Sequence, residues 1–227
     1  NKLPVSNLRI LLVGKNELEN SRLENIILDT TEFHSEDPSY LQQHNVRIDG
    51  KEEKRHITVI NTHLLEPNLS HHLIIQKVRE CVSLSAPGPH VIILVLQYKD
   101  FSENDSQRVK TVLNLFSEQG MKHTIVVTTD EETHWYILTY RNNAIHDLIK
   151  ECGGRHLQFD TRNPGWRSEL FRKTEEVLIG NMYEDGVDGS SVDLVRDDNE
   201  EEDSDLRECT ETGCDGRGLL KSFSFHE

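Results

Sequence analysis

The sequence predicts an α/β protein with a mostly parallel six-stranded sheet, one antiparallel edge strand, and helices on both faces. Two observations lead to this prediction. Apolar runs of strand length alternate with amphipathic segments, which is the pattern of βα units around a parallel sheet. A glycine-containing stretch also follows the first apolar run, at residues 8–13, as expected where a buried strand leads into a helix.

The elements follow one another at regular intervals. Strands are expected at residues 8–13, 45–49, 56–61, 91–96, 124–128 and 155–159. Gly50 between Asp49 and Lys51 suggests a hairpin turn, which would make one edge strand antiparallel. Helices are expected at residues 20–28, 70–82, 103–118, 134–151 and 166–179, with Ser102 as a cap and Gly153 as a stop signal.

The stretch after the first strand resembles a phosphate-binding loop that has lost its ligands. Such a loop reads GxxxxGK[ST], in which glycines admit the phosphates and the lysine contacts their oxygens. Counted from Gly14, the second glycine is Glu19 and the lysine is Asn20, while Ser21 is retained. A carboxylate about 4 Å from a phosphate charge repels it by roughly 4 kcal/mol. A strand, a glycine and a helix also occur in α/β proteins that bind no phosphate, and this alternative stays open.

The formal net charge of −15 is unevenly distributed. Residues 181–227 hold 15 acidic against 4 basic side chains, whereas residues 1–180 hold 25 against 21. We therefore expect a nearly balanced folded domain at 1–180 and an acidic, largely disordered tail at 181–227. Neither part has the basic stripe that nucleic acids require, so no nucleic-acid partner is expected.

The cysteines and the apolar runs indicate the compartment. The four cysteines form no CxxC pair, which fits a reducing environment, and Cys81 and Cys152 are expected to be core residues. The longest apolar run, at residues 91–96, is far shorter than the roughly 20 residues that cross a membrane. We expect a cytoplasmic protein with no transmembrane segment in this chain.

A longer segment carries a specific resemblance. Residues 80–90 read ECVSLSAPGPH and run directly into the apolar strand at 91–96. This segment resembles the signature box of the immunity-associated GTPases, the GIMAP family. The stretches FSEND at 101–105, KHTIVV at 122–127 and CGGR at 152–155 fall in register with the same family. The resemblance covers residues 7–180 and implies a three-layer, P-loop NTPase-like G domain of the AIG type.

The resemblance implies roles for positions in the first half of the chain. Gly14, Lys15 and Ser21 match the family's phosphate loop, in which the serine position holds Mg²⁺. The Asp-Thr-Pro-Gly motif of switch II falls on Asn61-Thr62-His63-Leu64, where the charge of the aspartate and the glycine are absent. The switch I threonine is not placed; Thr30, Thr31 and Ser39 are the candidates.

The guanine-reading positions implied by the resemblance also differ from the family pattern. The first motif falls on residues 128–131, where Thr128 is a candidate base contact and Glu131 stands near the usual aspartate. A second base contact, usually asparagine, falls on Asp160. GTP or GDP with Mg²⁺ is therefore a conceivable but doubtful cofactor, and no catalytic residue is assigned.

Other residue clusters have simpler interpretations. His63, His71 and His72 lack zinc-like spacing with an acidic or cysteine partner, so no metal site is expected there. Arg22 and Lys15 are alternative cations that could replace the missing lysine, although surface roles are commoner. The proline-rich step at residues 87–89 is either a rigid connector or a recognition loop.

Three functional hypotheses follow. The first is a degenerate G domain, with weak or no GTP hydrolysis, that acts through protein–protein interaction. The second is a GTP-binding protein with slow GTPase activity. The third assigns the function to the acidic tail. The resemblance implies homo- or hetero-association with other GIMAP-type G domains, a role in immunity, and contact with intracellular membranes through such partners.

Overall fold

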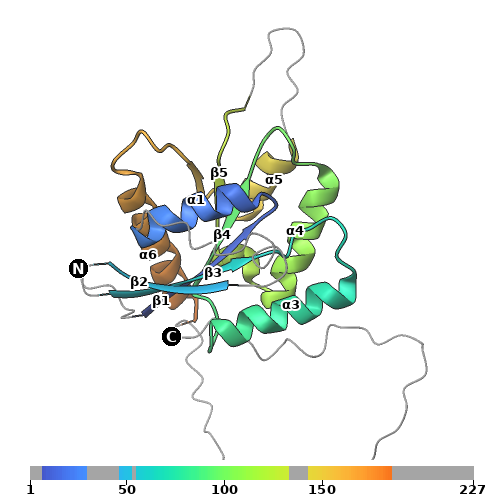
Figure 1. Ribbon diagram of the computed structural model, residues 1–227, viewed down its shortest axis with the longest axis horizontal. Helices are drawn as coiled ribbons and strands as arrows, with labels where there is room; N and C mark the ends of the chain where they lie inside the picture. The colour runs from blue at the N-terminus through green and yellow to red at the C-terminus, as the bar shows by residue number, and fades with distance from the viewer. Residues whose placement is uncertain (1–6, 30–45, 53–54, 133–142, 186–227) are drawn as a thin grey trace, which may run out of the picture.

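The computed structural model describes residues 7–29, 46–52, 55–132 and 143–185. Within them, six strands form one sheet in the order β2-β3-β1-β4-β5-β6 (Figure 1). The strands are β1 (Asn7–Gly14), β2 (Val46–Glu52), β3 (Arg55–Thr62), β4 (Val91–Leu96), β5 (Thr124–Thr128) and β6 (His156–Gln158). Five of them run parallel, and β2 pairs antiparallel with β3. The predicted α/β fold class is confirmed.

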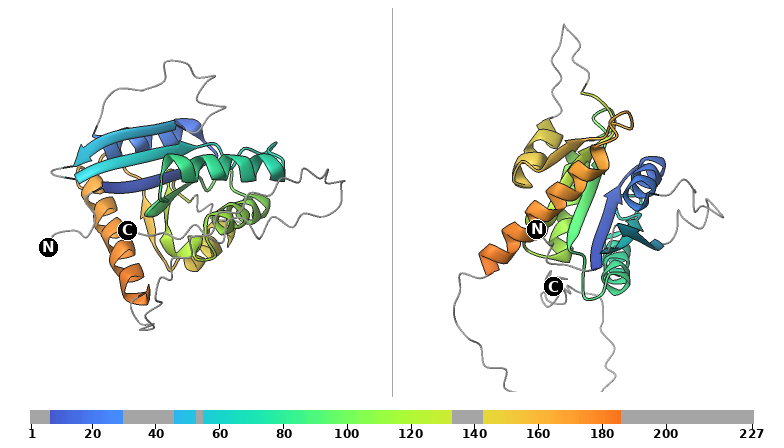
Figure 2. Two further views of the ribbon diagram at one scale, coloured as in Figure 1. Left: turned by 90° about the horizontal axis from the view of Figure 1, so that it is seen from below. Right: turned by 90° about the vertical axis from the view of Figure 1, so that its left-hand side faces the viewer.

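Helices cover both faces of the sheet (Figure 2). On one face lie α1 (Glu17–Leu28) and α6 (Trp166–Asp185), and on the other lie α3 (His71–Leu84), α4 (Glu103–Phe116) and α5 (Asn143–Glu151). A short 3₁₀ turn, η1 (Gly120–His123), precedes β5. None of the helices in the described residues is long and apolar enough to cross a membrane.

The core explains why the strands read as unbroken apolar runs. Alternate residues of β4 enter different clusters: Ile92 and Leu94 pack under α3, α4 and α5, whereas Ile93 packs under α1 and α6. A strand buried on both faces needs an apolar residue at every position. Cys81 and Cys152 are buried in the first cluster, where burial raises the pKa of both thiols, that of Cys152 to about 12.

Local signals fixed two of the helix ends as predicted. The Ser102 side chain accepts a hydrogen bond from the Asp105 backbone N–H, and the Asp105 carboxylate accepts one from the Ser102 backbone, which forms a capping box for α4. After α5, Gly153 and Gly154 take positive φ angles of 69° and 74°. Their backbone N–H groups bond to Lys150 and Ile149 carbonyls, which ends the helix.

Several predicted boundaries need correction. The predicted antiparallel pairing of the second and third strands is confirmed, but the turn is not at Gly50, which lies inside β2 and pairs with Ile57 of β3. The expected tail boundary at 180 cuts through α6, which continues to Asp185. The rest of the tail lies outside the described residues, as do the first part of the helix expected at 134–151 and the three switch I candidates Thr30, Thr31 and Ser39.

Candidate functional site

The phosphate-loop segment is largely helical. Asn16 is the N-cap of α1, and its side chain accepts a hydrogen bond of 3.3 Å from the Glu19 backbone N–H. The Asn20 backbone N–H donates to the Asn16 carbonyl at 3.0 Å. In a phosphate loop the helix follows the motif, whereas α1 begins inside it, at Glu17. The backbone donors of Glu19 and Asn20 are therefore used within the helix.

The helix start predicted at residue 20 is therefore wrong by nearly one turn. The sequence did contain the signal: Asn16 is followed three residues later by Glu19, the spacing of an N-cap and its acidic partner. Glu17 and Glu19 also place negative charge in the first turn, where the helix dipole favours it. Comparison with the GxxxxGK[ST] pattern treats residues 14–21 as a loop, so the N-cap at Asn16 was not predicted.

Asn20 turns into the protein and joins a buried polar chain. Its side chain is 1% exposed, and Nδ2 donates to Asn61 Oδ1 at 3.3 Å. Asn61 Nδ2 in turn donates to Glu24 Oε2 at 2.8 Å. The chain Asn20–Asn61–Glu24 thus joins the phosphate-loop position to the switch II position. Glu24 had no assigned role from sequence, because its partner is 37 residues away.

Glu19 and Arg22 form an ion pair on the first turns of α1. Arg22 Nη1 lies 3.1 Å from Glu19 Oε1. Arg22, a candidate substitute cation, is thus paired with the carboxylate that replaces the second glycine. Ser21, the predicted Mg²⁺ position, is half-buried between them in the helix.

Lys15 is bound to the start of α4. Its Nζ donates to the Asp100 carbonyl at 2.9 Å and to Asp105 Oδ2 at 3.2 Å. Partial burial raises the pKa of Asp105, but hydrogen bonds from Ser102 and Lys15 outweigh burial and leave that pKa below its ordinary value. This lysine, the other candidate for phosphate contact, is therefore engaged by a carboxylate.

One small cavity lies beside the loop in the described part of the chain. A cavity of about 10 Å³ is lined by Lys15, Asn16, Glu19 and residues 95–97, 100 and 101. Asn16 Nδ2 also crosses to Gln97 Oε1 at 3.0 Å. A single water needs roughly 10–15 Å³. This cavity accommodates about one water molecule and no phosphate group.

The switch II position is packed into the core. Thr62 is buried, and its Oγ1 donates to the Leu12 carbonyl at 2.9 Å. Leu64, at the place of the motif's glycine, is fully buried in the cluster under α3 and α4. Burial, followed by the charge of Lys77, lowers the pKa of His63 to about 4. These side chains anchor the segment after β3.

The base-reading positions lie together at the same edge of the sheet. The Phe159 N–H donates to the Thr128 carbonyl at 2.8 Å, which joins the ends of β5 and β6. Thr128 is buried, with its Oγ1 2.8 Å from His156 Nε2 and 2.9 Å from Gln158 Oε1. Its hydroxyl therefore links β5 to side chains of β6.

The two acidic candidates differ in their surroundings. Asp160 accepts hydrogen bonds from the Arg162 backbone and side chain, both at 2.9 Å, and these bonds lower the pKa of the carboxyl. Glu131 is exposed and makes no hydrogen bond or ion pair with the described residues. Of the three predicted base contacts, Glu131 alone leaves its acceptor oxygens unoccupied within that part of the chain.

Asp130 is a residue that sequence reasoning missed. Its carboxylate accepts hydrogen bonds from the Tyr98 and Lys99 backbone N–H groups at 2.6 and 3.1 Å. The segment between β4 and α4 is thus held from one side by Asp130 and from the other by Lys15. Its partners Tyr98 and Lys99 are 32 and 31 residues away in the sequence, so no local signal marked it.

The signature box lies at the opposite end of the strands, where β4 begins. Arg9 Nε donates to the Gly88 carbonyl at 2.6 Å. Arg9 and His90 exchange two bonds of 2.9 Å, from Arg9 N to His90 Nδ1 and from His90 N to the Arg9 carbonyl. These contacts favour the connector interpretation of residues 87–89. Within the described residues, no cluster of three or more His, Cys, Asp or Glu side chains could hold a metal ion.

The AIG1 family model matches residues 8–179 of this sequence. The chain belongs to the AIG1 family. The match covers the sheet, its helices and every candidate position described above, in agreement with the range predicted from the signature box.

Curated relatives within this family are also similar to the chain. GTPase IMAP family member 8 of Homo sapiens is 26% identical over 192 residues, which cover 78% of this chain and 28% of that protein. The protein of the same name from Rattus norvegicus is 31% identical over 133 residues, covering 56% and 19%. The chain therefore spans less than a third of the length of these relatives.

Solved structures show the same fold. Toc33 from Arabidopsis thaliana, in complex with Mg²⁺ and GMPPNP, has a TM-score of 0.58 at 14% identity, over 78% of this chain and 86% of Toc33. A structure from the chloroplast translocon components atToc33 and psToc159, for whose GTPase activity dimerization is important, has a TM-score of 0.56 at 14% identity, over 77% and 84%. The AIG1-family chain thus has the fold of these GTPase domains.

Proposed function

We propose that this chain is a degenerate G domain of the AIG1 family, with weak or no GTP hydrolysis, that acts through protein–protein association. One observation carries the proposal: Asn20, at the lysine position, points into the core toward Asn61 while α1 begins at Glu17. The amide is held by the fold and is not directed toward a ligand.

The residues of the loop do not fit a Mg²⁺–triphosphate. Glu19 places a carboxylate where backbone donors would meet an anion, and that repulsion is roughly 4 kcal/mol at about 4 Å. Loss of the lysine–phosphate contact removes about 1.5–3 kcal/mol more. Since about 1.4 kcal/mol is tenfold in affinity, these changes together weaken binding by several powers of ten.

Two exposed leucines lie in first helical turns that follow the carboxyl ends of β1 and β3. Leu18 in the first turn of α1 is 52% exposed, and Leu73 in the first turn of α3 is 44% exposed. Both helices follow the carboxyl ends of neighbouring parallel strands, β1 and β3. Exposed leucines at the nucleotide edge suit contact with another protein. The proposed partner is another AIG1-type G domain or a second copy of this chain.

Slow GTP hydrolysis is the second candidate function. Glu131 favours it, because its carboxylate is exposed and unoccupied by the described residues where a guanine would be read. The names of the curated relatives, which contain GTPase, also support it. The cytoplasmic location stays a prediction. The disorder expected for the acidic tail also stays a prediction.

Calorimetry separates the two candidates. The full chain is titrated with GTP, GDP and GMPPNP in the presence of Mg²⁺, and Toc33 serves as a positive control for GMPPNP. We expect no heat of binding at ligand concentrations of about 100 μM. Micromolar or tighter binding of any of the three would overturn the proposal in favour of the GTPase.

Sedimentation equilibrium tests the association. The full chain is examined alone and mixed with the human relative, GTPase IMAP family member 8. Leu18→Glu and Leu73→Glu are expected to weaken the complex at least about tenfold, because each buries a charge in the interface. Ile179→Glu, at an equally exposed position (45%) on α6, is the matched control and should leave it unchanged. Complexes insensitive to both leucine variants, or no complex at all, would refute the proposal.

A further inference from the structure

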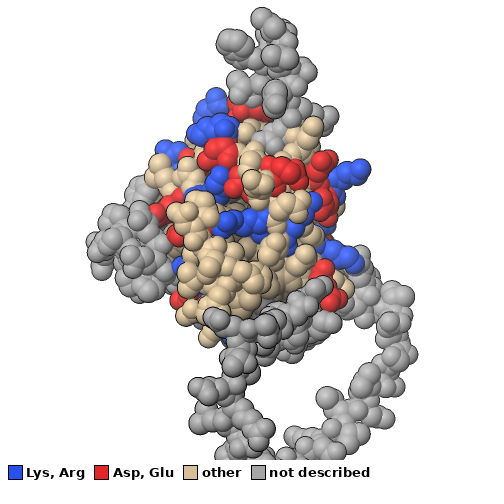
Figure 3. Space-filling view, turned by 90° about the vertical axis from the view of Figure 1, so that its right-hand side faces the viewer, with Lys and Arg blue, Asp and Glu red and all other residues tan. Residues whose placement is uncertain are grey.

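A polar hollow lies between α4 and α5 and is lined by none of the phosphate-loop, switch II or base-reading positions described above. Its volume is about 400 Å³, and it is lined by Glu103, Ser106, Lys110, Asp147, Lys150 and Glu151. On the face of the molecule beside α4, basic and acidic side chains are intermixed (Figure 3). Ligand pockets of roughly 300–1,000 Å³ are usually lined mainly by apolar side chains. The charged lining of this one selects for a charged ligand.

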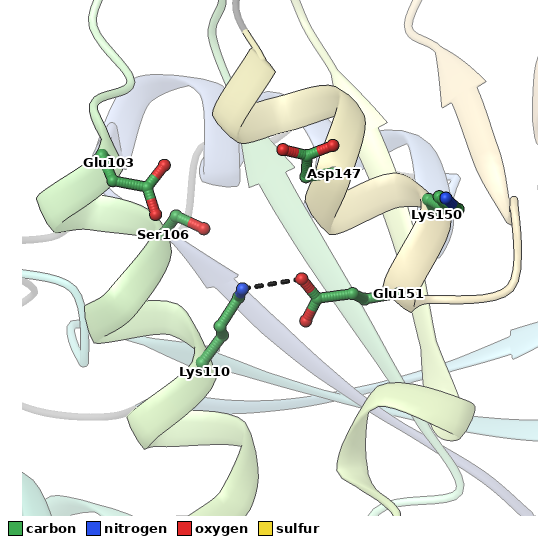
Figure 4. Close-up of a pocket in the computed structure, with 6 residues that line it drawn as sticks. All are labelled: Glu103, Ser106, Lys110, Asp147, Lys150 and Glu151. Atoms are coloured by element: carbon green, nitrogen blue, oxygen red, sulfur yellow. Dashed lines mark hydrogen bonds and ion pairs between the residues drawn. The ribbon is translucent and has the colours of Figure 1, made fainter.

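One pair in the hollow is already satisfied. Lys110 Nζ lies 2.7 Å from Glu151 Oε1 and bridges the two helices (Figure 4). The hydrogen bond from Lys110 to Glu151 raises the pKa of the lysine, and the nearby charges of Glu103 and Asp147 act in the same direction. Lys110 and Glu151 therefore neutralise each other.

Two carboxylates in the hollow have no ion-pair partner among the described residues. Glu103 on α4 accepts a hydrogen bond from the Gln107 amide at 3.1 Å but forms no ion pair within that part of the chain. Asp147 on α5 also forms none there. Figure 4 shows Glu103 on one wall of the hollow and Asp147 on the other. Lys150 lies farther along α5, so the end of the hollow between these two carboxylates is negative.

Ser106 supplies a third, independent group. Its residue is 2% exposed, it lines the hollow, and its side chain is directed from α4 toward α5 (Figure 4). The hydroxyl takes part in none of the hydrogen bonds among the described residues. Its Oγ atom stays accessible from the hollow, where a hydroxyl can donate or accept a hydrogen bond. Here the free direction of the hydroxyl is the interior of the hollow.

We propose that this hollow receives an arginine or lysine side chain from a basic segment of a partner protein. Its guanidinium or ammonium group would lie between Glu103 and Asp147, and its stem would pass Ser106. Charge-assisted hydrogen bonds to carboxylates are the strong ones, and neither of these carboxylates forms one with a cationic side chain among the described residues. Neither Leu18 nor Leu73 lines the hollow, so this inference does not depend on the association proposed at those residues.

Nuclear magnetic resonance of the full chain tests this inference with a short probe peptide, acetyl-Gly-Arg-Gly-amide. We expect shifts of the backbone amides of α4 and α5 that saturate on titration. A citrulline peptide, which keeps the shape and loses the charge, should bind at least about tenfold more weakly. Equal binding of the two peptides, or shifts confined to other elements, would overturn the proposal.

Variants of the chain identify the carboxylates. Glu103→Gln and Asp147→Asn should each weaken the arginine peptide about tenfold, and Ser106→Ala should do so to a smaller extent. Glu118→Gln, which removes an exposed carboxylate outside the hollow, is the matched control and should bind as the unaltered chain does. Unchanged affinity in both carboxylate variants, each checked for an unaltered circular dichroism spectrum, would refute the site. Saturable Mg²⁺ binding that displaces the peptide would refute it as well.

Discussion

Asn20 occupies the space that Gly14 leaves beside its Cα atom. A Cβ atom built on Gly14 would lie 2.2 Å from Asn20 Oδ1 and 3.0 Å from the Cβ of Val95. Oδ1 is buried and has no hydrogen-bond partner in the described part of the chain. The first glycine of the loop thus makes room for a side chain of α1, where the motif would use it to admit a phosphate.

Gly14→Ala is expected to destabilise the protein by about 1–3 kcal/mol, because the added methyl group overpacks a buried site. Adding Asn20→Ala should recover part of this loss. Urea unfolding of the single and double variants measures both effects. Gly180→Ala is the control, because no atom lies within 4 Å of its would-be Cβ and alanine favours the helix by about 1 kcal/mol. An unchanged free energy of unfolding in Gly14→Ala would show that Asn20 does not need this space.

Asn61→Asp, which restores the family's acidic residue, is expected to destabilise the fold by about 3 kcal/mol. The change removes the donor to Glu24 Oε2 and brings two carboxylates together in a buried site. Adding Glu24→Gln supplies an amide donor and should recover most of the stability. Denaturant unfolding of the four proteins gives the coupling energy. Additive effects of the two substitutions would contradict the pairing.

Stability is expected to fall as the solution becomes acidic. Burial, followed by the charges of Arg9 and His123, lowers the pKa of His90 to about 4 from an ordinary value of 6.5. Between these values His90 is protonated in the unfolded chain and neutral in the folded chain. The free energy of unfolding therefore falls as the pH falls from about 6.5 toward 4. His90→Asn keeps an acceptor for the Arg9 N–H and should reduce the loss by about 1–2 kcal/mol near pH 5. Unfolding curves at about pH 7, 6 and 5 test this, and an unchanged slope in His90→Asn would contradict it.

The fold was predictable because its signals are local. Alternation between two apolar clusters made β4 a continuous apolar run, and the Ser102 cap and Gly153 stop are readable within a few residues. Gly50 was misread because a glycine between polar residues fits an edge strand as well as a turn. Such a residue is decided by its pairing with β3, which the sequence does not display.

The site was predictable as a set of altered positions and not as a set of contacts. Asn20, Asn61 and Glu131 could be located from the family pattern alone. Their partners could not, because Lys15 with Asp105 and Asp130 with Tyr98 are joined across 90 and 32 residues. Long-range pairs of this kind leave no periodicity or spacing to recognise.

The early start of α1 makes the P-loop pattern difficult to introduce by single mutations. Glu19→Gly would put the least favourable common residue into a helical turn, Asn20→Lys would force an ammonium group into a buried amide's place, and Asn61→Asp would set two acids in contact. Each step lowers stability before any ligand can offset it. The P-loop residues could therefore be introduced only together with changes to the residues that contact them.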